Sequence, residues 1–276
     1  MNSFRKSKVT ISMVFFLILG PLNLHSETTE KENVEESSLN LDLEISSSYI
    51  FRGLNLFMED SNLDQNILLA PSVTWYPFDE KFSIAYWGGY QISGSNIRDN
   101  IKNGVGLEQD LVLKYDDISI WNNLTFSPSI NFYIYPFADS NVAGTSVPTY
   151  FDPIFAFNYQ TTFLKLGFNL TYYVGLEEAI RDSTYVYFNP TVSKEFTFEG
   201  DITLEILSGF GYKLYHKRSL MKDNVYDIFA SSVLEIRLSK KVYLKPHLDI
   251  AWTNLEGKGI SDEIAVLGGF HLGFDL

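Results

Sequence analysis

The sequence predicts an all-β fold, namely a closed antiparallel transmembrane β-barrel of about twelve strands spanning residues 39–276. Apolar and polar residues alternate with a period of two over most of the chain. Short and long connections also alternate along it. After the N-terminus, no apolar run approaches the ~20 residues that a membrane-spanning helix needs. Strands, not helices, are therefore expected to cross the membrane.

The composition removes several function classes. The chain has 276 residues, 45% of them hydrophobic, and no cysteine. The lack of cysteine excludes disulfides, thiolate metal sites and a cysteine nucleophile. The formal net charge of −13 argues against nucleic acid as a partner, because phosphate binding needs a basic surface.

The N-terminus predicts export. A basic segment at 1–8 precedes an apolar run at 9–19, and Gly20-Pro21 then breaks any helix. This pattern is typical of a secretory signal peptide, here expected to cover residues 1–26. Residues 27–38 are rich in glutamate, which predicts an acidic disordered tail.

The first expected strand shows the alternation clearly. Leu41, Leu43 and Ile45 alternate with Asp42 and Glu44, and the apolar phase continues through position 51. The same pattern predicts eleven further strands, at 67–75, 82–92, 107–115, 118–135, 151–160, 163–174, 185–194, 202–214, 225–238, 242–253 and 263–276.

The connections indicate which membrane the barrel crosses. Those after every second strand are short, at 77–81, 116–117, 161–162, 195–201 and 239–241, whereas the others are longer and polar. Outer-membrane barrels segregate loops in this way, with short periplasmic turns and longer extracellular loops. The last strand resembles the C-terminal assembly signal of bacterial outer-membrane proteins, with Leu276 where phenylalanine is usual. We therefore expect the outer membrane of a Gram-negative-type bacterium, with outer-membrane lipid, periplasmic chaperones and the barrel-assembly machinery as partners.

Solvation assigns the two faces of the sheet. Closure pairs every backbone group in hydrocarbon, apolar side chains then face lipid, and charged ones face the lumen. The expected lumen set is Asp42, Glu44, Glu108, Asp110, Lys114, Lys165, Glu205, Lys213, Asp227, Glu235, Arg237, Lys245, His247, Asp249 and His271. Aromatic residues near strand ends are expected in interfacial girdles, namely Trp75, Phe82, Tyr133, Tyr135, Tyr172, Tyr173, Tyr185 and Trp252.

Two features fit a regular barrel less well. Five prolines fall on the lipid-facing phase inside expected strands, where bulges or positions near the rims are predicted: Pro71, Pro128, Pro153, Pro190 and Pro246. The strand expected at 118–135 exceeds the ~9–11 residues needed to cross. A bulge near Asn122-Asn123 or a projecting strand would accommodate it.

The segment Ile45–Leu56 (ISSSYIFRGLNL) resembles the N-terminal strand of a family of uncharacterised proteobacterial outer-membrane proteins, the TorF-type porins. The matching residues are Ser48, Tyr49, Phe51, Arg52 and Gly53, with Ser48 where the family motif has aspartate. The resemblance implies an outer-membrane barrel.

Alternation places Tyr49 and Phe51 in the lipid or interface band and Arg52 in the lumen near the outer mouth, while Gly53 allows a sharp turn. For Arg52, pairing with a wall carboxylate is favoured over a role in selectivity.

An enzymatic function is not expected. Outside the signal peptide the histidines are His216, His247 and His271, and no serine lies at a recognised motif spacing from them. A metal site from His247, His271 and Asp249 is an alternative, but the spacing matches no known ligand pattern. Satisfied wall histidines are favoured, and neither a metal nor a cofactor is expected.

Passive transport through a narrow porin-like channel for small solutes is the favoured function, since twelve strands lie between filled eight-stranded barrels and open sixteen-stranded porins. The lumen or selectivity candidates are Arg52, Asp42, Glu44, Glu108, Asp110, Lys114, Glu205, Arg237, Lys245, His247 and Asp249. The alternatives are a non-conducting structural or surface-interaction barrel, a lipid-modifying outer-membrane enzyme and a soluble secreted β protein.

Overall fold

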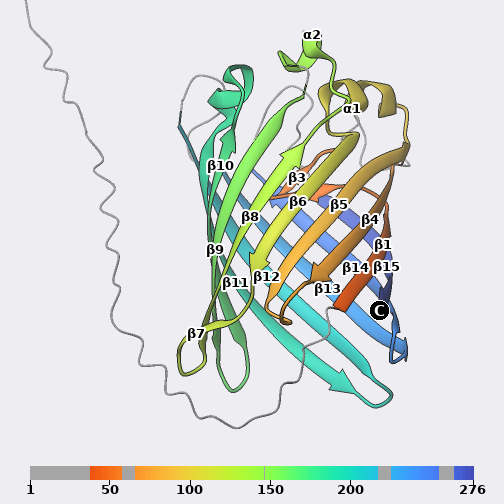
Figure 1. Cartoon of the computed structure of the whole chain (residues 1–276), viewed down its shortest axis with the longest axis vertical. Coiled ribbons are helices and arrows are strands. Elements are labelled where there is room, and N and C mark those ends of the chain that lie inside the picture. The colour runs from red at the N-terminus through yellow and green to blue at the C-terminus, as the bar shows by residue number, and fades with distance from the viewer. Residues whose placement is uncertain (1–37, 58–65, 146, 217–224, 255–263) are drawn as a thin grey trace, which may run out of the picture. The chain divides into compact units, whose positions relative to one another are not determined.

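The structure is a computed structural model that describes residues 38–57, 66–145, 147–216, 225–254 and 264–276. Twelve strands form the barrel (Figure 1): β1 (Ser38–Ser46), β4 (Ile67–Tyr76), β5 (Phe82–Ser93), β6 (Leu107–Tyr115), β8 (Leu124–Ile134), β9 (Thr149–Gln160), β10 (Lys165–Gly175), β11 (Tyr185–Phe198), β12 (Ile202–Tyr215), β13 (Val225–Ser239), β14 (Val242–Thr253) and β15 (Ala265–Asp275). The predicted signal peptide and acidic tail lie outside the described residues, except Ser38, which begins β1.

The first and last strands close the barrel. β1 pairs antiparallel with β4 on one side and with β15 on the other, so that Leu43 lies opposite both Pro71 and Leu272. Every other barrel strand pairs with its neighbours in the chain, and β6 pairs with β8. Closure gives the backbone groups of each strand partners on both sides, as a hydrocarbon environment requires. The prediction of a closed antiparallel barrel is confirmed.

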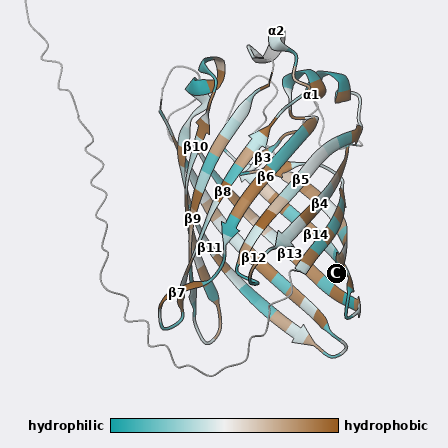
Figure 2. Cartoon of the chain, viewed as in Figure 1, coloured by the Kyte–Doolittle hydropathy of each residue, from teal (hydrophilic) through white to brown (hydrophobic). Residues whose placement is uncertain are grey.

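The two faces of the barrel differ in chemistry, and Figure 2 shows the alternation of hydrophobic and hydrophilic residues along the strands. Side chains of the outer phase, such as Leu111 and Phe155, are 41% and 43% exposed. Charged side chains of the other phase are buried inside, with Glu108 and Lys213 only 1% exposed. Pairing register places the whole predicted lumen set on this inner face.

The long connections carry the helices and share one rim. In Figure 1, α1 (Ile97–Asn103) and α2 (Ser140–Ala143) lie at the top, and the 3₁₀ helix η1 (Glu178–Ser183) follows β10 at the same end. The short turns lie at the opposite rim. No helix in the described ranges is long and apolar enough to cross a membrane.

The five prolines do not produce the predicted bulges. The strand register is the same on either side of each, and all five lie well inside their strands. The physical reason is that a residue in an antiparallel ladder bonds to only one of its two neighbouring strands. A proline therefore removes a donor from one ladder and leaves the other intact. The prediction of bulges or rim positions is wrong.

The segment expected as one long strand at 118–135 is a hairpin. β7 (Ile118–Trp121) pairs with the start of β8 around Asn123, whose φ of 64° makes the reversal. This hairpin extends the barrel at the rim of the short turns (Figure 1). The excess length is thus accommodated by projection, with the chain folded back on itself.

Candidate functional site

The first connection folds into the barrel as a small hairpin. β1 ends at Ser46, and β2 (Ile50–Phe51) and β3 (Leu54–Asn55) then pair with each other. The two residues between them, Arg52 and Gly53, have φ values of 48° and 80°. Positive φ at both central positions is what a tight two-residue hairpin turn requires. We call residues 49–56 the inner hairpin.

The base of the inner hairpin is held by hydrogen bonds and by an apolar anchor. The Leu56 amide donates to the Tyr49 carbonyl over 2.7 Å, and the Tyr49 ring packs 5.6 Å from Trp87 on the inner face of β5. The next residue, Phe57, is completely buried beside Leu68. Tyr49 and Phe51 therefore lie inside the barrel, and their predicted place in the lipid band is wrong.

Arg52 lies at the tip of the inner hairpin and contacts the opposite wall. Its guanidinium forms an ion pair with Asp152 on β9 and donates to the Tyr185 hydroxyl over 2.9 Å. Tyr133 also donates to Asp152, over 3.0 Å. The Arg52 and Asp152 side chains are 9% and 0% exposed. Arg52 thus pairs with a wall carboxylate, as the sequence favoured.

A second buried charged group holds the turn from another side. The Lys213 ammonium donates to the Arg52 carbonyl over 2.6 Å and lies 3.9 Å from Asp227. Asp227 also accepts from Tyr187 over 2.9 Å. A side chain at Gly53 would place its Cβ 2.3 Å from the Cβ of Asp227. Glycine is needed here both for the turn and for this close approach, so the predicted role of Gly53 as a turn residue is confirmed.

Tyrosines of the inner face surround the tip. The guanidinium carbon of Arg52 lies 5.3 Å from the ring centre of Tyr173 and 5.1 Å from that of Tyr187, within the range of cation–π attraction. Four aromatic residues predicted for the interfacial girdles belong to this buried cluster instead, namely Tyr133, Tyr135, Tyr173 and Tyr185. Their strand phase is inward, and the hydroxyls of Tyr133 and Tyr185 bond to Asp152 and Arg52 inside the lumen.

Two cavities adjoin below the inner hairpin. The larger, about 430 Å³, has Arg52, Glu44 and His247 in its lining. The smaller, about 230 Å³, is lined near the short-turn rim by Lys165 and Glu205. The two share wall residues Asn169, Asn189 and Phe229. The inner hairpin therefore occupies part of the lumen, and open space lined by both polar and apolar side chains lies beneath it.

Three further charged candidates, Lys114, Arg237 and Lys245, form ion pairs along the wall. Lys114 lies 2.8 Å from Asp116, and Arg237 lies 2.8 Å from Glu235 and 2.7 Å from Asp275. Lys245 is 2.9 Å from Glu235. Near the inner hairpin, Glu108 and Asp110 are 1% and 8% exposed. The structure thus separates the candidates into a buried group beside the inner hairpin and a solvated group toward the other rim.

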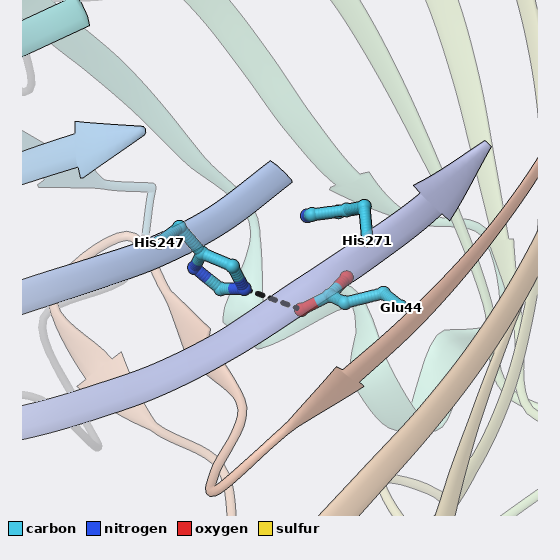
Figure 3. Close-up of side chains that lie close together, drawn as sticks. All are labelled: Glu44, His247 and His271. Atoms are coloured by element: carbon cyan, nitrogen blue, oxygen red, sulfur yellow. Dashed lines mark ion pairs between the residues drawn. The ribbon is translucent and has the colours of Figure 1, made fainter. Parts of the chain in front are cut away.

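Two histidines and a glutamate converge on one side of the lumen. Figure 3 shows His247 from β14, His271 from β15 and Glu44 from β1 turned toward one another. His247 Nε2 is 3.8 Å from Glu44 Oε1, and the two imidazole rings are 5.0 Å apart. His247 Nδ1 is 2.7 Å from Asp249, and His271 Nδ1 is 2.7 Å from Asp42.

Two residues of the site, Asp152 and Ser46, were not identified from the sequence. Asp152 follows the inward phase of its strand and was available from the period-two pattern. Ser46 Oγ lies 3.4 Å from His247 Nε2, a serine–histidine–aspartate arrangement that no sequence spacing indicates. Ser46 is 2% exposed and also donates to Glu44. Because the Ser46 hydroxyl is buried and turned to the lumen, it does not face the lipid outside the barrel.

No family model and no curated protein sequence matches the chain. Among solved structures it is similar to the NanC porin, with 10% identity, a TM-score of 0.52 and coverage of 86% of this chain and 98% of that one. It is also similar to an outer-membrane channel from Pseudomonas putida F1 (9% identity, TM-score 0.48, 90% and 100% covered). A third similar structure is LpxR from Salmonella typhimurium, with 10% identity, a TM-score of 0.48 and coverage of 85% of this chain and 99% of that one.

The fold is that of an outer-membrane β-barrel. At 10% identity, the likeness to the NanC porin shows this architecture and not the function. In an outer-membrane β-barrel of this type, the inward face is the place where function-specific residues gather, because the outward face is committed to lipid. The inner hairpin and the Glu44, His247 and His271 group are therefore the candidate functional features of this outer-membrane barrel.

Proposed function

We propose that the protein is a narrow porin-like channel for passive transport of small solutes across the outer membrane. The observation that carries this proposal is the pair of adjoining cavities inside a closed barrel, with Asn169 and Asn189 shared between them. Amide side chains such as Asn169 and Asn189 line part of these walls beside apolar residues. Water held next to such polar groups would supply the hydrated path that passive diffusion through a barrel requires.

The inner hairpin would set the width of the path. Arg52 joins it to Asp152, and Lys213 holds its backbone, so the hairpin is fixed at one level of the lumen. A solute must pass this level beside buried charges of both signs. We therefore expect small polar solutes to pass and large ones to be rejected.

A non-conducting structural or surface-interaction barrel is the second candidate. It is favoured by the inner hairpin itself, since the Arg52 and Asp152 side chains are almost fully buried. A hairpin so well packed fills much of the lumen around it. We propose no lipid-modifying function, because the buried hydroxyl of Ser46 is turned away from lipid.

The TorF-type resemblance remains a prediction. It rests on the segment that includes Phe51, Arg52 and Gly53, and these residues form the tip of the inner hairpin. We propose that the motif encodes this hairpin: a turn with positive φ at two positions and an arginine to pair inside the barrel. Periplasmic chaperones and the barrel-assembly machinery stay as proposed partners.

Liposome swelling tests the proposed function. Liposomes containing the refolded chain are diluted into isosmotic solutions of neutral sugars of increasing size. Swelling should be fast with the smallest sugars and should vanish with larger ones, while protein-free liposomes do not swell. A chain that shows heat-modifiable gel mobility, and is therefore folded, but gives no swelling with any sugar would favour the non-conducting barrel.

A further inference from the structure

We propose that Glu44, His247 and His271 bind a divalent first-row transition metal ion such as Zn²⁺ on the inner wall of the barrel. One ligand atom from each residue lies within 4.8 Å of the others (Figure 3). Two imidazoles and a carboxylate form a ligand set typical of zinc sites that keep an open fourth position. The inference goes beyond transport and does not depend on conduction.

Strand pairing explains how three side chains from three strands meet. Glu44 on β1 lies directly opposite His271 on β15. His247 on β14 lies opposite Gly269, the residue on β15 that is paired with Ser46 of β1. A Cβ at Gly269 would lie 2.6 Å from His247 Nε2. The missing side chain at Gly269 therefore lets the imidazole of His247 cross β15 and reach Glu44.

A carboxylate orients each imidazole. His247 Nδ1 is 2.7 Å from Asp249 Oδ2, and His271 Nδ1 is 2.7 Å from Asp42 Oδ1. With a proton on each Nδ1 held by a carboxylate, the lone pair is on Nε2. A carboxylate behind a histidine ligand is the usual arrangement at metal sites, where it fixes the tautomer and raises ligand basicity. Both His247 and His271 have such a carboxylate at Nδ1.

The local charge also favours a cation. Asp42, Glu44 and Asp249 surround the two imidazoles, whereas the nearby Lys245 ammonium is 2.9 Å from Glu235 and is held by it. The cavity of about 430 Å³ includes Glu44, His247 and Asp249 in its lining, so an ion can arrive through the lumen.

Metal binding requires the three ligand atoms, which lie within 4.8 Å of one another, to move closer together. His247 Nε2 and Glu44 Oε1 are 3.8 Å apart, and ligands at ~2.0–2.1 Å from a tetrahedral ion are about 3.4 Å apart. Glu44 accepts a hydrogen bond from Ser46, which can pass to the other carboxylate oxygen. Imidazole ligands favour Zn²⁺, Ni²⁺ or Cu²⁺ over Ca²⁺ and Mg²⁺, which prefer oxygen.

Calorimetric titration with Zn²⁺ tests the site in the refolded full-length chain in detergent. We expect one ion per chain, and no comparable binding of Ca²⁺. H271A and E44Q should each weaken Zn²⁺ binding by about 100-fold or more, and D42N by about 10- to 100-fold. The matched control is the H25A/H216A double variant, which removes the other two of the four histidines and should bind as the wild type does.

Electron paramagnetic resonance of Cu²⁺ bound to the wild-type chain identifies the ligands directly, so the wild-type spectrum tests the site even if a variant misfolds. Nitrogen hyperfine splitting from two imidazoles is expected, falling to one in H271A. The proposal is overturned if the folded wild type binds no Zn²⁺, if H271A binds it as tightly as the wild type, or if the Cu²⁺ spectrum shows only oxygen ligands. In each of these outcomes the cluster is a hydrogen-bonded polar group only.

Discussion

Arg52 and Asp152 form a buried ion pair that joins the tip of the inner hairpin to strand β9, although 100 positions separate them in the chain. The pair connects an element that is not part of the barrel wall to the wall itself. Since the hairpin adds no strand to the barrel, it can be loosened without opening the sheet. The width of the lumen thus depends on contacts that substitution can remove selectively.

Breaking this ion pair should destabilise the barrel measurably. Arg52→Ala leaves the Asp152 carboxylate buried without its cation, which costs about 3 kcal/mol in the free energy of unfolding. Adding Asp152→Asn to Arg52→Ala should recover part of that loss, because the unpaired charge is gone. Denaturant titration of refolded protein measures the free energy of unfolding of the single and the double variant. Arg98→Ala, on the exposed face of α1, is the control. Equal losses in the single and double variants would contradict the pairing.

The same substitution should change ion preference. Arg52→Ala removes a cation from a lumen level that also holds Asp152 and Asp227, so the path becomes more favourable to cations. The reversal potential in a salt gradient should shift toward cation selectivity. The shift should shrink at high salt, because the screening length falls from ~10 Å at 0.1 M to ~3 Å at 1 M. An unchanged reversal potential would assign Arg52 a structural role alone.

Neighbouring residues of β6 test the two faces. Leu111 is 41% exposed on the outer phase at the centre of its strand, so Leu111→Arg should cost about 2–4 kcal/mol in unfolding free energy as the charge enters lipid. Val112→Arg should cost less, because Val112 has the inward phase of Asp110 and Lys114. The comparison uses denaturant titration in lipid vesicles. Similar costs would show that β6 does not face lipid as described.

The orientation in the membrane is tested by epitope insertion. An epitope after Asn103, at the end of α1, should be labelled on intact cells, whereas one at Asp79-Glu80, in the turn between β4 and β5, should not. Lysed cells supply the control, since both epitopes should then be labelled. Reversed labelling on intact cells would invert the topology.

The period-two pattern predicted the strands and the two faces because barrel strands repeat one physical demand, lipid on one side and water on the other. The inner hairpin escaped prediction for the same reason. Tyr49 and Phe51 continue the apolar phase of β1, and no local signal separates an apolar face toward lipid from one packed inside. The contacts that hold the turn in the lumen come from groups distant in the sequence, such as Asp152 and Lys213.

The histidine and glutamate group was predicted only in part, because the sequence grouped His247 and His271 with Asp249 as alternative metal ligands and did not place Glu44 with them. His247, His271 and Glu44 are far apart in sequence, and the register of β14, β15 and β1 alone makes them neighbours. Gly269 contributes by lacking a side chain, which no spacing rule detects. Inward phase could be read from the sequence, but the height of each residue along the barrel could not.

Single-channel recording in planar bilayers tests most directly whether the barrel is a channel narrowed by the inner hairpin. The refolded wild type and Arg52→Ala are compared at the same protein and salt concentrations, after heat-modifiable gel mobility has shown that both are folded. Small stepwise conductance is expected for the wild type and larger steps for Arg52→Ala, because the tip of the hairpin then loses its contact with Asp152 across the lumen. The absence of steps in both folded proteins would contradict the channel.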